Sequence, residues 1–147
     1  ATKNCNGKTP SNIKFQNDDL KILNKYKDNI GNIRSKIDQQ DINFYIEYII
    51  NSLFEANKYF NDQEPWKKKD DLIRLNTIVY TTLEIVRKIS FLLYPIIPES
   101  SLKALKIFNL SKKDIKLESI INNEFLVKDK KINTIDILFK KIEKKND

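Results

Sequence analysis

The chain has 147 residues, of which 40% are hydrophobic and 32% charged, and its formal net charge is +7 at pH 7. These values are typical of a single globular domain rather than of a disordered chain. Histidine is absent and Cys5 is the single cysteine, which excludes histidine metal sites, histidine acid–base chemistry and an internal disulfide. No apolar run reaches the roughly 18 residues that cross a bilayer. We expect a cytoplasmic protein without a membrane partner.

The positive charge comes almost entirely from lysine, with 24 Lys and 3 Arg. Such an excess favours polyanionic partners without identifying them. Ile, Lys and Asn, the residues with the most A- and T-rich codons, together supply 64 positions. The lysine surplus can therefore reflect selection for nucleic-acid binding or base composition, and the sequence leaves both explanations open.

Residues 1–17 are rich in Asn, Lys, Thr and Ser, which predicts a helix end followed by an irregular loop. The chain does not begin with Met, and we expect a fragment of a longer protein. A first helix is predicted from caps at Asp18 and Asp19 to about Gln39. Gly31 costs this helix about 1 kcal/mol relative to alanine, and we expect it to mark close helix packing. Apolar residues recur every three or four positions along it: Leu23, Tyr26, Ile30, Ile33 and Ile37.

A second helix is predicted from the cap at Asp41 to Asn61 and Asp62. Its apolar face comprises Ile42, Ile46, Ile49, Ile50, Leu53 and Phe60. Four aromatic residues widen that face: Phe44, Tyr45, Tyr48 and Phe54. We therefore expect this helix to be central in the fold and buried on two sides.

A third helix is predicted from near Asp70 to Leu93, ended by Pro95 and Pro98. Its inward residues are expected to be Leu72, Leu75, Ile78, Val79, Leu83, Val86, Ile89 and Leu93. Pro98 suits the first position of a fourth helix that continues to about Phe108. Beyond it we expect a short helix at 115–123, a brief extended segment at 125–132 and a closing helix or turn. Ile135, Leu138, Phe139 and Ile142 would pack in that last element.

No alternation typical of strands persists, and only two glycines and four prolines are available for turns. The predicted fold class is therefore all-α, an antiparallel helix bundle. We divide the chain into a truncated helix end and loop at 1–17, a helical bundle at 18–110 and a closing segment of the same domain at 111–147.

The segment between the second and third helices holds the only tryptophan, Trp66, after Pro65 and before the lysines 67–69. Ammonium groups beside a large flat ring suit an anionic partner with stackable bases, which describes single-stranded nucleic acid. Alternatively, Trp66 closes the end of a core while Lys67, Lys68 and Lys69 face water. From the residues alone, both interpretations stay open.

Two polar residues at the end of the second helix, Asn57 and Tyr59, are further candidates if the loop folds back on them. Asn57 could hydrogen-bond a base edge or cap backbone groups of the loop. The carboxylate pairs at 18–19 and 70–71 lie at helix starts, where capping explains them. No Gly-rich phosphate loop and no nucleophile with a base is visible, so we predict no catalytic residue and no metal.

The sequence around this segment resembles the anticodon-binding domain of methionyl-tRNA synthetase. Ala-Asn-Lys-Tyr-Phe at 56–60, followed after four residues by Pro65 and Trp66, carries the resemblance. The stretches 3–10, 83–98 and 138–143 also match that family in order and spacing. The last of these departs from the family where Lys140 replaces a proline and Lys141 an arginine.

This resemblance implies a class I synthetase helical bundle that recognises the CAU anticodon of methionine tRNA, with Trp66 stacking on an anticodon base. Pro65, Asn57 and Tyr59 would belong to the same anticodon-binding site, and residues 67–69 would contact phosphates. The family also uses an Asn and an Arg on a bundle helix that would precede Ala1. Its catalytic signatures are absent here, so the parent's catalytic domain, not this fragment, would bind ATP and attach methionine. The alternative is a protein–protein scaffold in which Trp66 is a buried anchor.

Overall fold

The structure is a computed structural model that describes residues 8–131. Within that range the chain forms five α-helices and two short 3-10 helices. They are α1 Asn17–Asp38, α2 Ile42–Gln63, η1 Pro65–Lys67, α3 Leu72–Leu93, α4 Pro98–Lys106, η2 Lys112–Asp114 and α5 Leu117–Ile121. The part of the chain that is described contains no strand beyond an isolated bridge between Lys8 and Lys131. The predicted all-α class is confirmed, while the predicted element at 135–142 lies outside the described residues.

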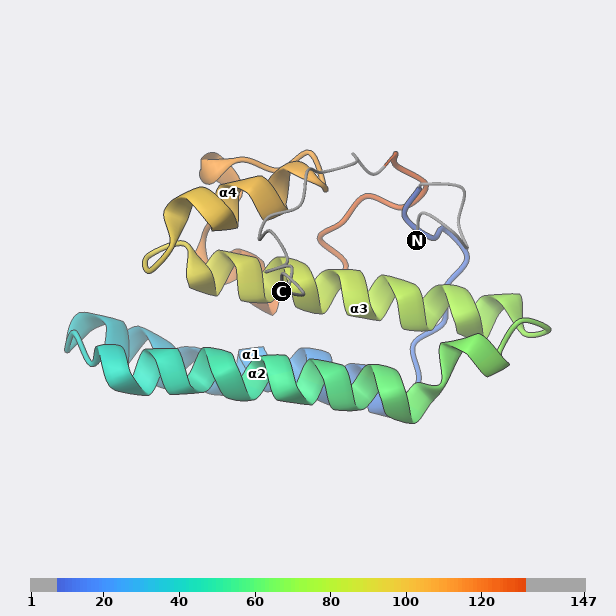
Figure 1. Cartoon of the computed structure of the whole chain (residues 1–147), viewed down its shortest axis with the longest axis horizontal. Coiled ribbons are helices and arrows are strands. Elements are labelled where there is room, and N and C mark those ends of the chain that lie inside the picture. Colours follow the sequence, from blue (N-terminus) through green and yellow to red (C-terminus); the bar gives the residue numbers. More distant parts are fainter. Residues whose placement is uncertain (1–7, 132–147) are drawn as a thin grey trace, which may run out of the picture.

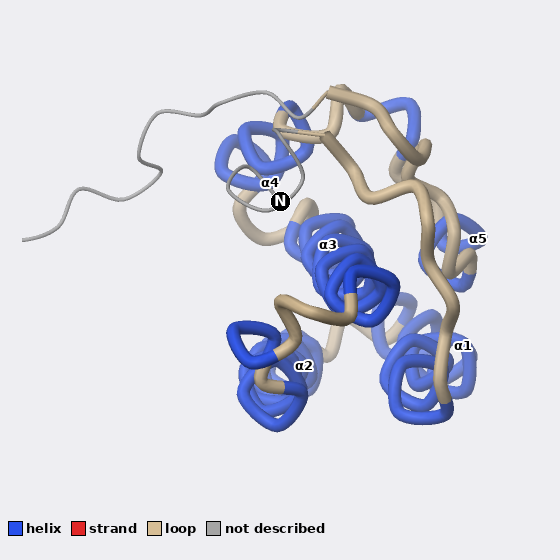
Figure 2. The backbone as a smooth tube through the Cα atoms, turned by 90° about the vertical axis from the view of Figure 1, so that its right-hand side faces the viewer, coloured by secondary structure: helices blue, strands red, loops and turns tan. Residues whose placement is uncertain are grey.

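α3 is the central helix, with α1, α2, α4 and α5 arranged around it (Figure 2). The prediction that α2 is central was wrong. α3 also has the most buried residues of the described helices, and Thr77, Ile78, Tyr80 and Ile85 are fully enclosed. α1, α2 and α3 run side by side over most of their length (Figure 1), so their apolar faces close one core.

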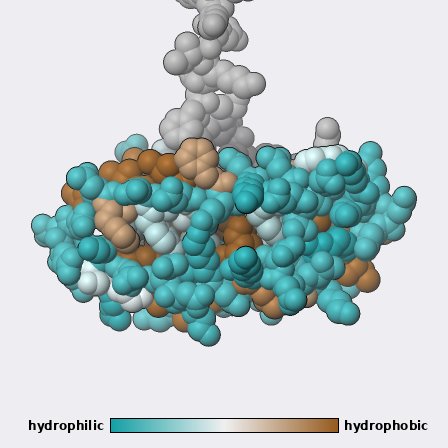
Figure 3. Space-filling view, turned by 90° about the horizontal axis from the view of Figure 1, so that it is seen from below, coloured by the Kyte–Doolittle hydropathy of each residue, from teal (hydrophilic) through white to brown (hydrophobic). Residues whose placement is uncertain are grey.

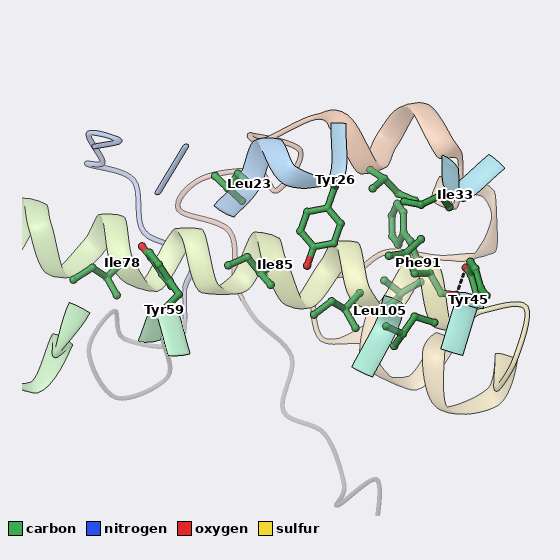
Figure 4. Close-up of a cluster of buried hydrophobic side chains, with 13 residues drawn as sticks. Leu23, Tyr26, Ile33, Tyr45, Tyr59, Ile78, Ile85, Phe91 and Leu105 are labelled. Atoms are coloured by element: carbon green, nitrogen blue, oxygen red, sulfur yellow. Dashed lines mark hydrogen bonds between the residues drawn. The ribbon is translucent and has the colours of Figure 1, made fainter. Parts of the chain in front are cut away.

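The main core lies between these three helices and is capped by α4 and α5 (Figure 4). Leu23 and Ile33 enter from α1, Ile78 and Ile85 from α3, and Leu105 from α4. Buried tyrosines bring polar hydroxyl groups with them, and those of Tyr45, Tyr59 and Tyr80 donate hydrogen bonds. The hydroxyl of Tyr45 donates to the backbone carbonyl of Leu92, and this bond attaches α2 to the end of α3.

The apolar stripe predicted to be buried on α2 is largely exposed instead. Its core-facing side carries Tyr45, Ile49, Ser52 and Tyr59. Exposed large apolar side chains on the other side are Ile42, Ile46, Ile50, Leu53, Phe54 and Phe60. The face formed by α1 and α2 accordingly shows brown patches among hydrophilic atoms (Figure 3). Leu72 and Val86 of α3, also predicted inward, are exposed, with 65% and 39% of their surface accessible.

Helix starts agree closely with the predicted caps. Asp41 accepts a hydrogen bond from the backbone N–H of Phe44, and Asp71 from that of Arg74. α1 begins two to three residues earlier than predicted, because Gln16 is its N-cap and Asp19 accepts the Gln16 N–H at 2.8 Å. Each cap satisfies backbone donors that have no partner within the helix.

Gly31 does not mark close packing, contrary to the prediction. It is exposed near the middle of α1, and a Cβ added there would meet nothing within 4 Å. Glycine loses more conformational freedom on folding than other residues, so Gly31 lowers the stability of α1, and no close contact compensates for this loss.

A buried polar cluster on α3 holds the segment that follows α4. Arg87 pairs with Glu84, and its guanidinium donates to the carbonyls of Ser119 at 2.8 Å and Asn122 at 2.6 Å. Glu84 in turn accepts the backbone N–H of Leu126 at 2.7 Å. The cluster thus satisfies irregular backbone that would otherwise be buried without partners.

The two ends of the described chain meet beside α3. The backbone N–H of Thr9 donates to the carbonyl of Lys130, and that of Asp129 to the carbonyl of Thr9, both at 2.8 Å. The extended segment expected at 125–132 is not found in its described part: residues 125–131 contain a bend, a turn with Asp129 at φ 58° and one isolated bridge at Lys131. The division at 1–17, 18–110 and 111–147 stays a prediction.

Candidate nucleic-acid interface

The candidate site is the turn between α2 and α3, at the right-hand end of the molecule in Figure 1. Glu64 ends α2 in the left-handed conformation, with φ 47° and ψ 57°. That conformation redirects the backbone sharply, and Pro65 then begins η1 with a fixed φ. Pro65 is itself buried, so the turn is anchored at the point where it leaves α2.

Trp66 follows the buried proline and is 51% exposed. Its ring lies against Phe60 of α2, with the ring centroids 6.2 Å apart and the planes inclined by 57°. Phe60 supports one side of the indole while much of the ring stays open to solvent. A half-exposed, supported aromatic ring is the geometry on which an unpaired base can stack.

The three lysines predicted as phosphate contacts lie in and after η1. Lys67 and Lys69 are exposed and Lys68 is partly buried. The ammonium of Lys67 lies 2.8 Å from a carboxylate oxygen of Glu64, a pair exposed enough to be worth little. The ammonium groups of the three lysines therefore remain available to a polyanion that lies beside the indole.

Asn57 and Tyr59 occupy different sides of α2. Asn57 is exposed and shares, by its spacing, the helix face of Phe60, the residue that supports Trp66. Tyr59 is 7% exposed and its hydroxyl donates to Asp19 in the core. The structure brings Asn57 to the Trp66 side of the helix and gives Tyr59 an internal bond; contact of either residue with RNA stays a prediction.

Beneath the turn lies a buried ion pair that the sequence did not predict. The guanidinium of Arg74 on α3 holds both carboxylate oxygens of Asp19 on α1, at 2.6 and 3.1 Å. It also donates to the side-chain oxygen of Gln63, the last residue of α2. One side chain thus joins three helices at Gln63, three residues before Trp66. Asp19 and Arg74 were each visible at a helix start, but sequence carries no signal that pairs positions 55 apart.

The protonation states of this pair follow from its surroundings. Burial alone would raise the pKa of Asp19, but hydrogen bonds from Arg74, Tyr59 and the Gln16 backbone outweigh it and leave the pKa lowered. Burial lowers the pKa of Arg74, but the hydrogen bonds to Asp19 together with the charges of Asp19, Tyr59 and Asp18 outweigh burial, so the net shift is upward. Both groups therefore stay charged at neutral pH.

A groove of about 310 Å³ lies next to the site, between the start of α1 and the end of α2. It is lined by lysines 21, 25 and 58 but also by Asp18, Glu55 and Asp62. Lys25 is paired with Glu55 across it. Because the charges balance, this groove does not favour a polyanion as the lysines beside Trp66 do.

Within residues 8–131, no group of three Cys, Asp or Glu side chains is placed to hold a metal ion. Over the same residues, no helix is both long and apolar enough to span a bilayer. The candidate site combines the exposed ring of Trp66, the exposed amide of Asn57 and the ammonium groups of residues 67–69, which can bind and orient a partner.

Comparison with known proteins identifies the family of the chain. A family model described as the anticodon binding domain of methionyl tRNA ligase matches residues 9–147. Methionine–tRNA ligase of Brucella suis is 36% identical over 106 residues, which cover 71% of this chain and 21% of that protein. The enzyme of Rhizobium meliloti is 38% identical over 104 residues, covering 70% and 20%. The chain thus spans about a fifth of the length of these relatives.

A solved structure extends the likeness to the fold. Methionyl-tRNA synthetase of Mycobacterium tuberculosis bound by methionyl-adenylate superposes with a TM-score of 0.84 at 26% identity, over 95% of this chain and 28% of that one. Fold and match together place the chain among helical anticodon-binding domains. It belongs to the family of the anticodon-binding domain of methionyl-tRNA ligases, which confirms the resemblance found in the sequence.

Proposed function

We propose that this chain binds the anticodon loop of methionine tRNA, with the CAU anticodon as its target, and serves as the tRNA-recognition part of a methionine–tRNA ligase. The observation that carries the proposal is the exposed indole of Trp66, supported by Phe60 and flanked by lysines. In the relatives the matched region is a small part of a longer enzyme. The remaining part of such a parent would use ATP to attach methionine to its tRNA.

In this arrangement Trp66 stacks on one anticodon base, and Pro65 holds the backbone behind it. Stacking contributes about 1–3 kcal/mol per base but is indifferent to base identity. Asn57, on the same side of α2, has both a donor and an acceptor and can bond a base edge. Lys67, Lys68 and Lys69 neutralise phosphates, and Tyr59 supports the site from within the core.

Further parts of the proposal concern partners that lie outside this chain. The remaining anticodon contacts and the catalytic domain come from the same longer polypeptide. This domain requires no cofactor of its own, and it acts in the cytoplasm, where tRNA is charged.

A scaffold in which Trp66 is a structural anchor is the competing function. It requires the indole to be buried, whereas 51% of Trp66 is exposed and its ring lies against Phe60, which is itself at the surface. This exposure favours a ring that is available for stacking over a ring that is a buried structural anchor.

The sole tryptophan provides the test. Adding a stem–loop with a CAU anticodon should quench Trp66 fluorescence and protect the ring from acrylamide, and a stem–loop with a different anticodon should bind more weakly. An indole that responds to neither RNA would contradict the proposal.

A further inference from the structure

The carboxamide of Gln63 is fixed at both ends, at the residue where α2 gives way to the turn. Its oxygen accepts from Arg74, and its nitrogen donates to Asp18 of α1 at 3.3 Å. Gln63 immediately precedes Glu64 and lies three residues before Trp66. The direction in which the chain enters the turn is therefore set by a side chain tied to α1 and α3.

Arg74 also controls the other end of the turn. Its backbone N–H donates to the Asp71 side chain at 3.0 Å, which caps α3, while its guanidinium reaches back to Gln63. Residues 64–71, which include Trp66, are thus closed at their base by one residue, through its backbone at one end and its side chain at the other. The guanidinium is itself held by Asp19, whose side chain is fully buried.

We propose that Arg74 and Asp19 are positioning residues for Trp66: acting through Gln63, they fix the turn so that the indole faces an incoming anticodon base. The proposal rests on the proposed function and adds residues that touch no RNA. A buried ion pair is a weak source of stability, since apolar residues of similar volume often replace one at no cost. A two-pronged arginine–carboxylate pair does fix direction, because both oxygens must be met at once.

The ring's orientation matters for affinity because an unfixed ring must be ordered when RNA binds. Ordering a mobile side chain and its loop opposes association, so a turn held in advance binds more tightly with no new contact. Loosening the turn should then weaken RNA binding even though Trp66, Phe60 and the lysines all remain.

Two variants that keep the charge of the site test this role. Gln63→Leu removes the bond to Arg74, and Arg74→Lys keeps a cation that cannot hold Asp19 and Gln63 together. Gln39→Leu, at the exposed C-terminal cap of α1, is the matched control. For each folded variant we would measure affinity for the CAU stem–loop, thermal unfolding, and the fluorescence anisotropy decay of Trp66 without RNA.

We expect Gln63→Leu to weaken RNA binding by roughly threefold to tenfold, part of the stacking contribution, and to increase the fast motion of Trp66. Its melting temperature should stay within a few degrees of the parent, and the control should change nothing. Arg74→Lys should lower affinity at least as much; if it does not fold, Gln63→Leu decides alone.

The proposal is overturned if Trp66 motion is unchanged in Gln63→Leu, or if the motion increases while affinity stays the same in a protein whose Trp66→Ala variant loses affinity. Failure of the proposed function is separate: there Trp66→Ala itself would leave RNA binding unaltered. The anisotropy measurement needs no RNA and still decides whether the buried pair orders the ring.

Discussion

Lys88 is the residue whose chemistry departs furthest from what its type suggests. It is fully buried on α3, where its ammonium donates to Asn123 at 2.6 Å and to the carbonyl of Leu23 at 3.2 Å, and it lies 5.4 Å from the ring centre of Tyr26. Burial and, to a lesser extent, the charge of neighbouring Arg87 lower the pKa of Lys88 to about 7, against the opposing effect of Glu84. The helical pattern predicted neither the burial of Lys88 nor its lowered pKa, because position 88 is not among the residues expected to face inward on the third helix.

This depressed pKa predicts how stability depends on pH. Between about 7 and the ordinary lysine pKa near 10.4, the unfolded chain holds a proton at Lys88 that the folded chain has released. Stability therefore rises with pH in that window, by up to about 1.4 kcal/mol per pH unit. Tyrosine pKa values raised by burial, such as that of Tyr45 at about 12, reverse the trend above pH 10.

Denaturant unfolding of the parent and of Lys88→Met at pH 7, 8 and 9 would check this prediction. The parent should gain stability over the series, and the variant, which has no proton to release, should be nearly flat. A parallel rise in both proteins would assign the pH dependence to another group.

At the scale of elements, Gly31 lowers the stability of α1, and a substitution could restore that stability. The position is helical, exposed, and free of any neighbour within 4 Å of an added Cβ. Gly31→Ala should therefore raise the free energy of unfolding by about 0.5–1 kcal/mol, through lower entropy of the unfolded chain and better helix propensity. Chemical denaturation at neutral pH measures it; a destabilised variant would mean that α1 packs more tightly there than the structure indicates.

Element boundaries were largely predictable because local chemistry determines them. Asp41, Asp71 and Pro98 act within one turn of their own positions, and the helices begin where these residues indicate. The buried face of α2 was not predictable. Its sequence offers two apolar stripes, one with Ile42 and Ile46 and one with Tyr45 and Ile49, and only packing against α1 and α3 selects the second.

The candidate site likewise has one part that could be predicted from the sequence and one part that could not. Trp66 and the lysines after it could be found from the sequence because they are adjacent, and the resemblance to the family gave them a role. The Asp19–Arg74–Gln63 network could not be found, since its members come from three helices and meet only through the fold.

At the scale of the molecule, a net charge of +7 predicts salt-sensitive RNA binding. Three lysines at 67–69 that each neutralise a phosphate of a single-stranded loop contribute about 2 to the slope of log K against log salt. The triple variant Lys67→Gln/Lys68→Gln/Lys69→Gln should reduce the slope by about that amount.

The control for this prediction removes equal charge from the other side of the molecule, with Lys103→Gln/Lys113→Gln/Lys116→Gln on and after α4. These lysines are exposed. Equal loss of slope in both triple variants would attribute the salt effect to net charge rather than to the turn between α2 and α3.

The central claim is that Trp66 is the surface on which an anticodon base stacks. The most direct measurement is the affinity of the parent and of Trp66→Ala for a CAU anticodon stem–loop at one moderate salt concentration, with Phe54→Ala, another exposed aromatic on α2, as control. Loss of one stacked base should weaken binding by about 1–3 kcal/mol, roughly fivefold to 150-fold, with the control unchanged. Equal affinity of the Trp66→Ala protein and the parent, both folded, would contradict the claim.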